Sequence, residues 1–436
     1  MGNIGERVVF KDMKDLKTVI LAAGKGTRMK SDVPKVLHSV CGKPIIQYVL
    51  DVAAAAGSLK TCVVVGHQGE RVRAALPAGV GTVTQEKLLG TADAVKCALP
   101  FFKERSGDLL VLCGDTPLLR KETIRGLIRT HRKAAADVTV LTAVVEQSVG
   151  YGRIIRNAQG TAVAIREEND ATPDEKEILE INVGVYCFRL SVLESGLSQI
   201  GENAKKKEFY LTDIIELVAG QSGTVATYTV EDATEGLGVN SRQDLAVADS
   251  HIRQRILQFW MANGVTVVDP MTTFIYDNVR IGRDTVIRPF TVIEENVRIG
   301  TNCRIGPFAH LRPSTKIGHN TEIGNFAEVS RSSVGNNCFM KHFSFLGDAR
   351  VGNMVNIGAG VVTANFDGKN KNETLIADNA FIGSDSILVA PVKIGKAAIT
   401  GAGSVVTKGK KIPAGGVAVG VPARIIYKGT KEGSGA

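Results

Sequence analysis

The sequence is poor in aromatic residues and contains no long apolar segment. Aromatic side chains make up 5% of its 436 residues, and only one of them is Trp. No apolar run approaches the ~18 residues that a membrane-spanning helix requires. Residues 1–17 are charged and mixed, whereas a signal peptide would carry an apolar core there. We therefore expect no membrane partner and a cytoplasmic location.

The cysteines are few and scattered. Seven are present, which is an odd number, and no two of them form a CxxC pair. A disulfide framework or a cysteine-based zinc site would need regular pairs, so we expect neither. Unpaired cysteines are usual in a reducing compartment, which agrees with a cytoplasmic protein.

Glycine and positive charge are plentiful by contrast. The 47 glycines are about 11% of the chain, against a usual ~7%, and predict many tight corners. A net charge of +9 favours anionic ligands. Because the basic residues are dispersed along the sequence, we expect small anionic molecules as partners and no nucleic acid.

Residues 1–240 have the pattern of an α/β domain. Short apolar runs rich in β-formers alternate with helical patterns, which predicts a mostly parallel, Rossmann-like sheet covered on both faces. Such sheets bind ligands at the carboxyl ends of their strands. The apolar runs are residues 18–22, 61–65 and 109–113, and the helical patterns include residues 44–55 and 91–99.

Residues 241–263 predict a single linking helix. Apolar side chains recur there at helical spacing, and Asn263-Gly264 provides a stop signal. We interpret Trp260, near the end of this segment, as a core-packing residue. The apolar positions are Leu245, Ala248, Ile252, Ile256 and Trp260.

Residues 264–436 carry a period of six. Nine aliphatic residues recur in unbroken register, a small residue often stands four positions after them, and the register resumes after two slips and a loop. This is the hexapeptide repeat of a left-handed parallel β-helix, in which three repeats make one triangular coil. The nine positions are Ile275, Ile281, Ile287, Ile293, Ile299, Ile305, Leu311, Ile317 and Ile323.

A polar insertion at residues 363–374 interrupts the hexapeptide repeat. Loops that leave a repetitive scaffold often carry function, so this segment is a candidate functional loop. The alternative is that it is a tolerated surface loop. The β-helix itself could be only a scaffold or a trimerisation device.

The first apolar run leads into a glycine-rich turn, Gly24-Lys25-Gly26-Thr27-Arg28. A Walker P-loop is excluded, because Val19 stands where its first Gly belongs. Backbone N–H groups and the cations Lys25 and Arg28 could still hold a triphosphate there. A further cation, Lys35, follows Pro34.

Residues 21–51 resemble the sugar-1-phosphate nucleotidylyltransferases, because the pattern LAAGxGTRM…PK is intact. Further segments continue the resemblance, and the appended hexapeptide repeats make the order similar to that of the bifunctional N-acetylglucosamine-1-phosphate uridylyltransferase/glucosamine-1-phosphate acetyltransferases. The likeness extends over about residues 18–425. The further segments are residues 85–92, 112–118, 150–153, 180–184, 208–213 and 238–240.

This resemblance implies that UTP and a sugar 1-phosphate react with release of pyrophosphate. It implies Mg²⁺ ligated by Asp115 and Asn240, with Arg28 and Lys35 as catalytic residues that steady the phosphates. The implied nucleotide-binding residues are Leu21, Ala22, Ala23, Gly24, Lys35, Gln85, Gly90 and Thr91. The implied sugar-phosphate contacts are Gly152, Glu167, Asn182 and Asn240.

For the β-helix, the resemblance implies acetyl transfer from acetyl-CoA. His342 is the implied general base, because an imidazole titrates near neutral pH. The implied acceptor-binding residues are Arg312, Asn356 and Lys371. The implied acetyl-CoA-binding residues are Ala359, Asn365, Ser384, Ala402 and Arg424. Membership of this fold family also implies a homotrimer.

The chain departs from the family pattern at several positions. In the first domain these are Leu88, Cys113 and Val183, and they bear on nucleotide choice. In the β-helix, Ser330 stands where an acceptor-binding Lys is usual, and Phe345 and Phe366 replace Tyr. Three alternatives therefore remain: the bifunctional enzyme, a uridylyltransferase with a silent β-helix scaffold, and a nucleotidylyltransferase whose β-helix acetylates a different acceptor.

Overall fold

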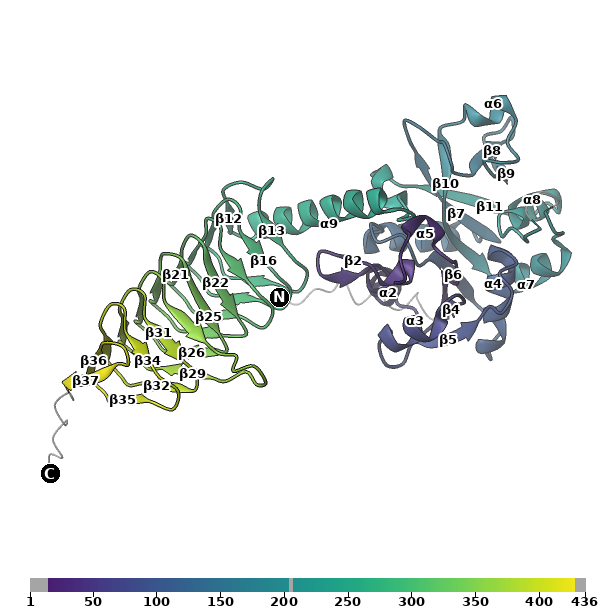
Figure 1. The fold of residues 1–436 in the computed structure, drawn as a ribbon. Coiled ribbons are helices and arrows are strands. Elements are labelled where there is room, and N and C mark those ends of the chain that lie inside the picture. Colours follow the sequence, from purple (N-terminus) through teal and green to yellow (C-terminus); the bar gives the residue numbers. More distant parts are fainter. Residues whose placement is uncertain (1–14, 204–206, 428–436) are drawn as a thin grey trace. The chain divides into compact units, whose positions relative to one another are not determined.

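The computed structural model describes residues 15–203 and 207–427. They divide into two compact units, with a boundary between Asp249 and Ser250. That boundary lies within helix α9, Arg242–Ala262, in the segment for which the sequence predicts a linking helix. Figure 1 shows the elements of both units.

The first unit is built on a mixed sheet of nine strands. Its main path runs β11-β7-β10-β6-β1-β4-β5, and β8 and β9 form a hairpin attached to β10. Strand β10 is antiparallel to both of its main-path neighbours, whereas the other pairs on this path are parallel. The strands are β1 Leu16–Ala22, β4 Lys60–Val65, β5 Gly81–Thr84, β6 Asp108–Cys113, β7 Val138–Val144, β8 Arg153–Arg156, β9 Ala162–Arg166, β10 Glu180–Arg189 and β11 Val225–Thr229.

Helices cover both faces of this sheet, because its strands are apolar on both sides. In β1, Val19 packs with one core cluster and Ile20 with the other, and neither side chain is exposed. Helices α4 Thr91–Ala98, α7 Leu190–Gln199 and α8 Asp213–Gly220 contribute to the first cluster. Helices α2 Ile45–Ala55, α3 Gly69–Ala75 and α5 Lys121–Lys133 contribute to the second.

Shorter elements complete the unit. They are the paired strands β2 Ser39–Val40 and β3 Lys43–Pro44, helix α6 Pro173–Lys176, and the 3-10 helices η2 Thr27–Met29, η3 Lys35–Leu37, η4 Leu99–Phe101 and η5 Ala233–Gly236. No helix in the described part of the chain is both long enough and apolar enough to span a membrane.

The second unit is a triangular prism of stacked coils, as the period of six predicts (Figure 1). We call its three sheets the first, second and third faces. The first face contains β12 Thr266–Val267, β15 Val286–Ile287, β18 Arg304–Ile305, β21 Glu322–Ile323, β24 Phe339–Met340, β27 Asn356–Ile357, β30 Phe381–Ile382, β33 Ile399–Thr400, β36 Val417–Val419 and β37 Arg424–Tyr427.

The other two faces each have eight strands. The second contains β13 Phe274–Ile275, β16 Val292–Ile293, β19 His310–Leu311, β22 Ala327–Ser330, β25 Ser344–Gly347, β28 Val362–Ala364, β31 Ile387–Val389 and β34 Val405–Val406. The third contains β14 Arg280–Ile281, β17 Arg298–Ile299, β20 Lys316–Ile317, β23 Ser333–Val334, β26 Ala349–Val351, β29 Thr374–Ile376, β32 Val392–Ile394 and β35 Lys411–Ile412.

The aliphatic residues of the hexapeptide repeat fill the prism. Ile287, Ile305 and Ile323 are wholly buried and stand directly above one another in register. Each such side chain contributes ~1.5–3 kcal/mol by burial. Trp260 of α9 packs against the same core, as the sequence predicts. None of the seven cysteines, which all lie within the described residues, forms a disulfide.

Candidate active sites

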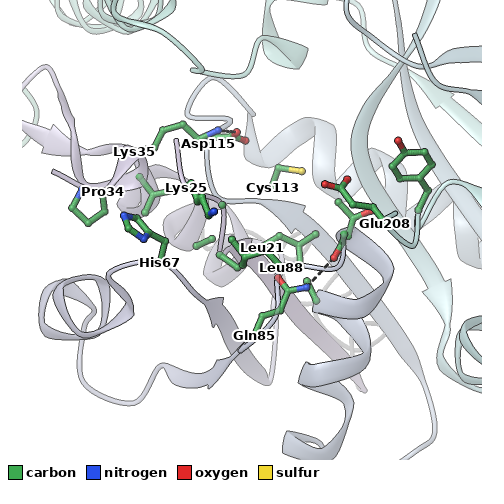
Figure 2. A pocket seen from close by; sticks show the side chains of 18 of the residues that line it. Leu21, Lys25, Pro34, Lys35, His67, Gln85, Leu88, Cys113, Asp115 and Glu208 are labelled. Atoms are coloured by element: carbon green, nitrogen blue, oxygen red, sulfur yellow. Dashed lines mark hydrogen bonds and ion pairs between the residues drawn. The ribbon is translucent and has the colours of Figure 1, made fainter. Parts of the chain in front are cut away.

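A cavity of about 590 Å³ opens in the first unit where parallel strands end (Figure 2). His67 follows β4, Gln85 follows β5 and Asp115 follows β6, and all three side chains line the cavity. This is the edge at which sheets of this kind bind ligands. The predicted site residues that line it are Leu21, Ala22, Ala23, Gly24, Lys35, Gln85, Gly90, Thr91, Asp115 and Glu167.

The glycine-rich turn supplies free hydrogen-bond donors to this cavity. Within the described residues, the backbone N–H groups of Gly24, Lys25 and Gly26 donate to no other protein group. Gly26 has a φ of +60°, and a Cβ there would lie 2.9 Å from the Cβ of Lys35. Glycine therefore lets the turn fold closely over Lys35. A row of unpaired N–H groups beside a cation suits a phosphate chain.

Lys35 joins the two residues for which the resemblance implies a metal. Its ammonium group donates to the Asp115 carboxylate and, at 3.1 Å, to Oδ1 of Asn240. Both oxygens thus converge on one positive charge, and the Lys35 and Asp115 side chains are only 16% and 22% exposed. Two oxygen donors with few other protein ligands fit Mg²⁺, which usually takes the rest of its ligands from water and phosphates.

Gln85, Gly90 and Thr91 lie together at the start of α4. The Gln85 side chain is 4% exposed, and its Nε2 donates to the Gly90 carbonyl at 3.0 Å. Gly90 has a φ of +104°, and a Cβ there would lie 2.5 Å from the Phe209 carbonyl oxygen. Only glycine fits this position without strain. Leu88, one of the departures from the family pattern, lines the cavity with an apolar surface.

Three of the four residues implied to contact the sugar phosphate, Gly152, Glu167 and Asn182, also meet. The Asn182 N–H donates to the Gly152 carbonyl at 2.8 Å. A Cβ on Gly152 would lie 3.6 Å from Asn182 and 3.7 Å from the Glu167 carboxyl carbon. The Tyr186 hydroxyl accepts a hydrogen bond from the Asn182 amide at 2.7 Å. These contacts hold polar groups beside the part of the cavity that Glu167 lines.

Acidic groups gather at the same end. Burial, followed by the Glu167 and Glu216 carboxylates, raises the pKa of Asp213 to about 6. Burial, followed by Glu208, raises the pKa of the Tyr210 phenol to about 12, so this hydroxyl stays protonated at neutral pH. Burial and Asp115 likewise raise the pKa of the Cys113 thiol to about 12. Neither the phenol nor the thiol is an ionised nucleophile in this cavity.

In the prism, the strand register brings four predicted residues into one column. His342, Ala359, Ser384 and Ala402 each stand two positions after paired residues of the first face. We call this the first corner, because it joins the first face to the second. His342 is exposed and, among the described residues, its side chain has no hydrogen bond or ion pair. Asn356 lies on the first face, between Phe339 and Phe381.

Other predicted residues lie at the second corner, between the second and third faces. Lys371 lines a hollow of about 370 Å³ together with Arg331, Asp348 and Arg350. Arg331 pairs with Asp348 through two hydrogen bonds of 2.8 and 2.9 Å. The remaining predicted residues of this corner are Arg312, whose Nη1 donates to Glu328 at 3.1 Å, and Asn365, whose amide donates to Asp348.

Two known families match parts of the chain. The family described as MobA-like NTP transferase domain matches residues 18–171. The family described as bacterial transferase hexapeptide (six repeats) matches residues 278–313 and 296–331.

Curated relatives match nearly the full length. A "Bifunctional protein GlmU" of Desulfitobacterium hafniense is 41% identical, with 92% of this chain and 95% of the relative covered. The protein of the same name from Fervidobacterium nodosum is 44% identical, with 95% and 96% covered. That of Geobacillus thermodenitrificans is 43% identical, with 92% and 94% covered. The chain belongs to the GlmU family of bifunctional proteins.

GlmU family membership confirms the resemblance drawn from the sequence and, with the two domain matches, the predicted fold class. The structure does not gather every implied residue. Arg28 is exposed on η2 and does not line the cavity. Arg424 lies on β37 and is exposed.

Sequence reasoning also missed cavity residues. His67 follows a predicted strand, so the rule that ligands bind at strand ends could have found it. Glu208 and Tyr210 lie in a segment without regular structure; the resemblance includes residues 208–213, but it assigns no role to either side chain.

Proposed function

We propose that the chain makes UDP-N-acetylglucosamine in two steps. The acetyl group of acetyl-CoA passes to the amine of glucosamine 1-phosphate, and UTP then transfers its uridylyl group to N-acetylglucosamine 1-phosphate with release of pyrophosphate. Membership of a bifunctional family supports both activities. The observation that carries the second step is the cavity lined by the glycine-rich turn, Lys35 and Asp115, with Asn240 bonded to the Lys35 ammonium group.

In the uridylyl step, the sugar phosphate oxygen attacks the α-phosphorus of UTP. The turn at residues 24–26 would bind the phosphates through its N–H groups, with Lys35 beside it as a cation. Asp115 and Asn240 would hold Mg²⁺, which supplies charge neutralisation to the phosphates. Arg28 would steady the phosphates only by reaching back toward the cavity, because its side chain is exposed outside it.

Different side chains would contact the base and the sugar. Gln85 and Gly90 would face the uracil edge, with Thr91 beside them at the start of α4. Gly152, Glu167 and Asn182 would contact the sugar. A site that positions both reactants in this way lowers the reaction barrier mostly by holding them in the correct orientation.

In the acetyl step, the acceptor amine needs a free lone pair to attack the thioester. His342 would take the amine proton, and an exposed imidazole that bonds to none of the described residues is available for this. Ala359, Ser384 and Ala402, in the same corner, would line the acetyl-CoA groove, with Arg424 at the end of the prism. The acceptor would be bound by Arg312, Asn356 and Lys371, and acetyl-CoA would also contact Asn365.

The positions of these residues support a homotrimer. His342 precedes β25 and the Lys371 hollow follows it, so a four-residue strand of roughly 13 Å separates the two corners in one chain. One copy therefore does not bring the proposed base beside Arg312 and Lys371. We propose that the first corner of one subunit meets the second corner of a neighbour.

We place both reactions in the cytoplasm, since none of the seven cysteines in the described part of the chain forms a disulfide. The alternative of a different acetyl acceptor draws support from Ser330. This residue replaces the family's Lys and is buried, at 1% exposure, so its hydroxyl cannot take over the contact of an extended ammonium group.

Two assays on the purified protein test this function. Free CoA thiol is measured with acetyl-CoA and a panel of amino sugars and their 1-phosphates, and pyrophosphate is measured with UTP and N-acetylglucosamine 1-phosphate. We expect thiol release only with glucosamine 1-phosphate. Pyrophosphate without thiol release would support the silent scaffold. Thiol release with another acceptor would support a changed specificity.

A further inference from the structure

The buried amide of Gln85 has a defined orientation. Its Nε2 donates both to the Gly90 carbonyl at 3.0 Å and to Oδ2 of Asp93 at 2.7 Å. A carbonyl and a carboxylate only accept hydrogen bonds, so the nitrogen of the amide has to face them. Figure 2 shows this nitrogen joined to its partner by a dashed line.

The oxygen of the same amide is left without a donor. Among the described residues, no group donates to Oε1 of Gln85, although the side chain is 4% exposed and lines the cavity. This oxygen is not itself fully buried, so a donor group of a ligand in the cavity can reach it. The cavity therefore offers a ligand one oriented acceptor at this point.

Asp93 contributes the stronger of the two bonds that set this orientation. A hydrogen bond to a charged acceptor is roughly twice as strong as a neutral one. Asp93 lies in the first turn of α4, where the helix N-terminus stabilises a carboxylate. Without Asp93, only the Gly90 carbonyl would orient the Gln85 amide. The two orientations of this amide, which exchange its oxygen and nitrogen, would then differ in free energy by only one neutral hydrogen bond.

We propose that Asp93 is a positioning residue that makes the site select uracil over cytosine. N3 of uracil carries a hydrogen and donates, so it pairs with Oε1 of Gln85, whereas N3 of cytosine is an acceptor and faces a second acceptor. A site built to bond an N–H group rejects an analogue that lacks it. This inference rests on the proposed function, in which Gln85 faces the base.

The test compares kcat/KM for UTP and CTP, measured by pyrophosphate release, in the wild type, Asp93→Ala and Asp93→Asn. We expect the UTP-to-CTP ratio to fall roughly tenfold in Asp93→Ala, mainly through a higher KM for UTP. The ratio for Asp93→Asn should lie between those of the wild type and Asp93→Ala, because the amide oxygen of Asn can still accept a hydrogen bond from Gln85. Glu122→Gln, which removes a first-turn carboxylate from α5, is the matched control and should keep the wild-type ratio.

Calorimetric binding of UTP and CTP gives a second readout that does not depend on turnover. If both Asp93 variants are folded by circular dichroism and keep the wild-type ratio, the proposal is wrong. It is also wrong if Gln85→Ala leaves the ratio unchanged, since Gln85 then does not read the base. Absence of pyrophosphate release from the wild type would instead overturn the proposed function.

Discussion

Replacing Lys35 with Met should strengthen metal binding to the nucleotide-free protein. The ammonium group of Lys35 contacts the same two oxygens, on Asp115 and Asn240, that we assign to Mg²⁺. A metal ion that binds without nucleotide has to displace this group. Met has a similar length and no charge, so Lys35→Met removes the competitor and leaves the oxygens in place.

The size of the effect follows from the exposure of the pair. Two unit charges 4 Å apart attract by about 4 kcal/mol at an effective dielectric constant of 20. Desolvation and side-chain entropy offset much of that, and exposed pairs retain only ~0–1 kcal/mol. With 16% and 22% exposure, this pair lies between the two limits. A net value of about 1.4 kcal/mol corresponds to a roughly tenfold lower Kd for the metal.

Free Mn²⁺, counted by electron paramagnetic resonance during a titration, measures this Kd. Lys25→Met is the matched control, because Lys25 also lines the cavity but makes no hydrogen bond or ion pair with Asp115 or Asn240 in the described part of the chain. It should keep the Kd within about twofold. Uridylyl transfer should fall in Lys35→Met despite the tighter metal. If Lys35→Met binds Mn²⁺ as tightly as the wild type or more weakly, the inference that the Lys35 ammonium group and the metal compete for the same oxygens is refuted.

Three further predictions concern other parts of the two sites. His342→Ala should lose acetyl transfer by at least ~100-fold while pyrophosphate release persists, and equal loss of both would indicate unfolding. Gly90→Ala should lower the melting temperature and raise the KM for UTP, because of the φ of +104° and the Cβ position 2.5 Å from the Phe209 carbonyl oxygen; unchanged melting would contradict this strain. Burial and Glu167 raise the pKa of Asp213 from 3.8 to about 6, so the folded protein holds a proton that the unfolded chain releases. The free energy of unfolding should therefore decrease as pH rises from about 4 to about 6, and urea titrations should find this decrease missing in Asp213→Asn.

Much of the fold is readable from the sequence because its determinants are local. The period of six specifies which side chains enter the prism, and Ile287, Ile305 and Ile323 are buried in register as it requires. Strand ends in the first unit likewise locate Gln85 and Asp115 at one edge of the sheet.

The rest of the candidate sites depends on contacts between distant segments. Lys35 meets Asp115 and Asn240 across 80 and 205 residues of chain, and no local pattern contains that meeting. The resemblance groups His342 with Lys371 in one site, whereas the coil register separates them onto two corners. Asp93 is only eight residues from Gln85, but its role depends on the backbone at Gly90.

The stacked coils have a consequence for how the chain folds. Strands of the prism mostly pair with strands eighteen residues later, as when Phe274 pairs with Val292 and Val292 with His310. Every such pairing closes a short loop, so its entropic cost is small and the same at each coil. Proteins with contacts of low sequence separation fold quickly. We therefore expect the prism to fold by adding one coil after another to a nucleus formed at any coil. In the first unit, by contrast, β11 has to pair with β7 before the sheet is complete, and the paired residues Val138 and Val225 are 87 positions apart.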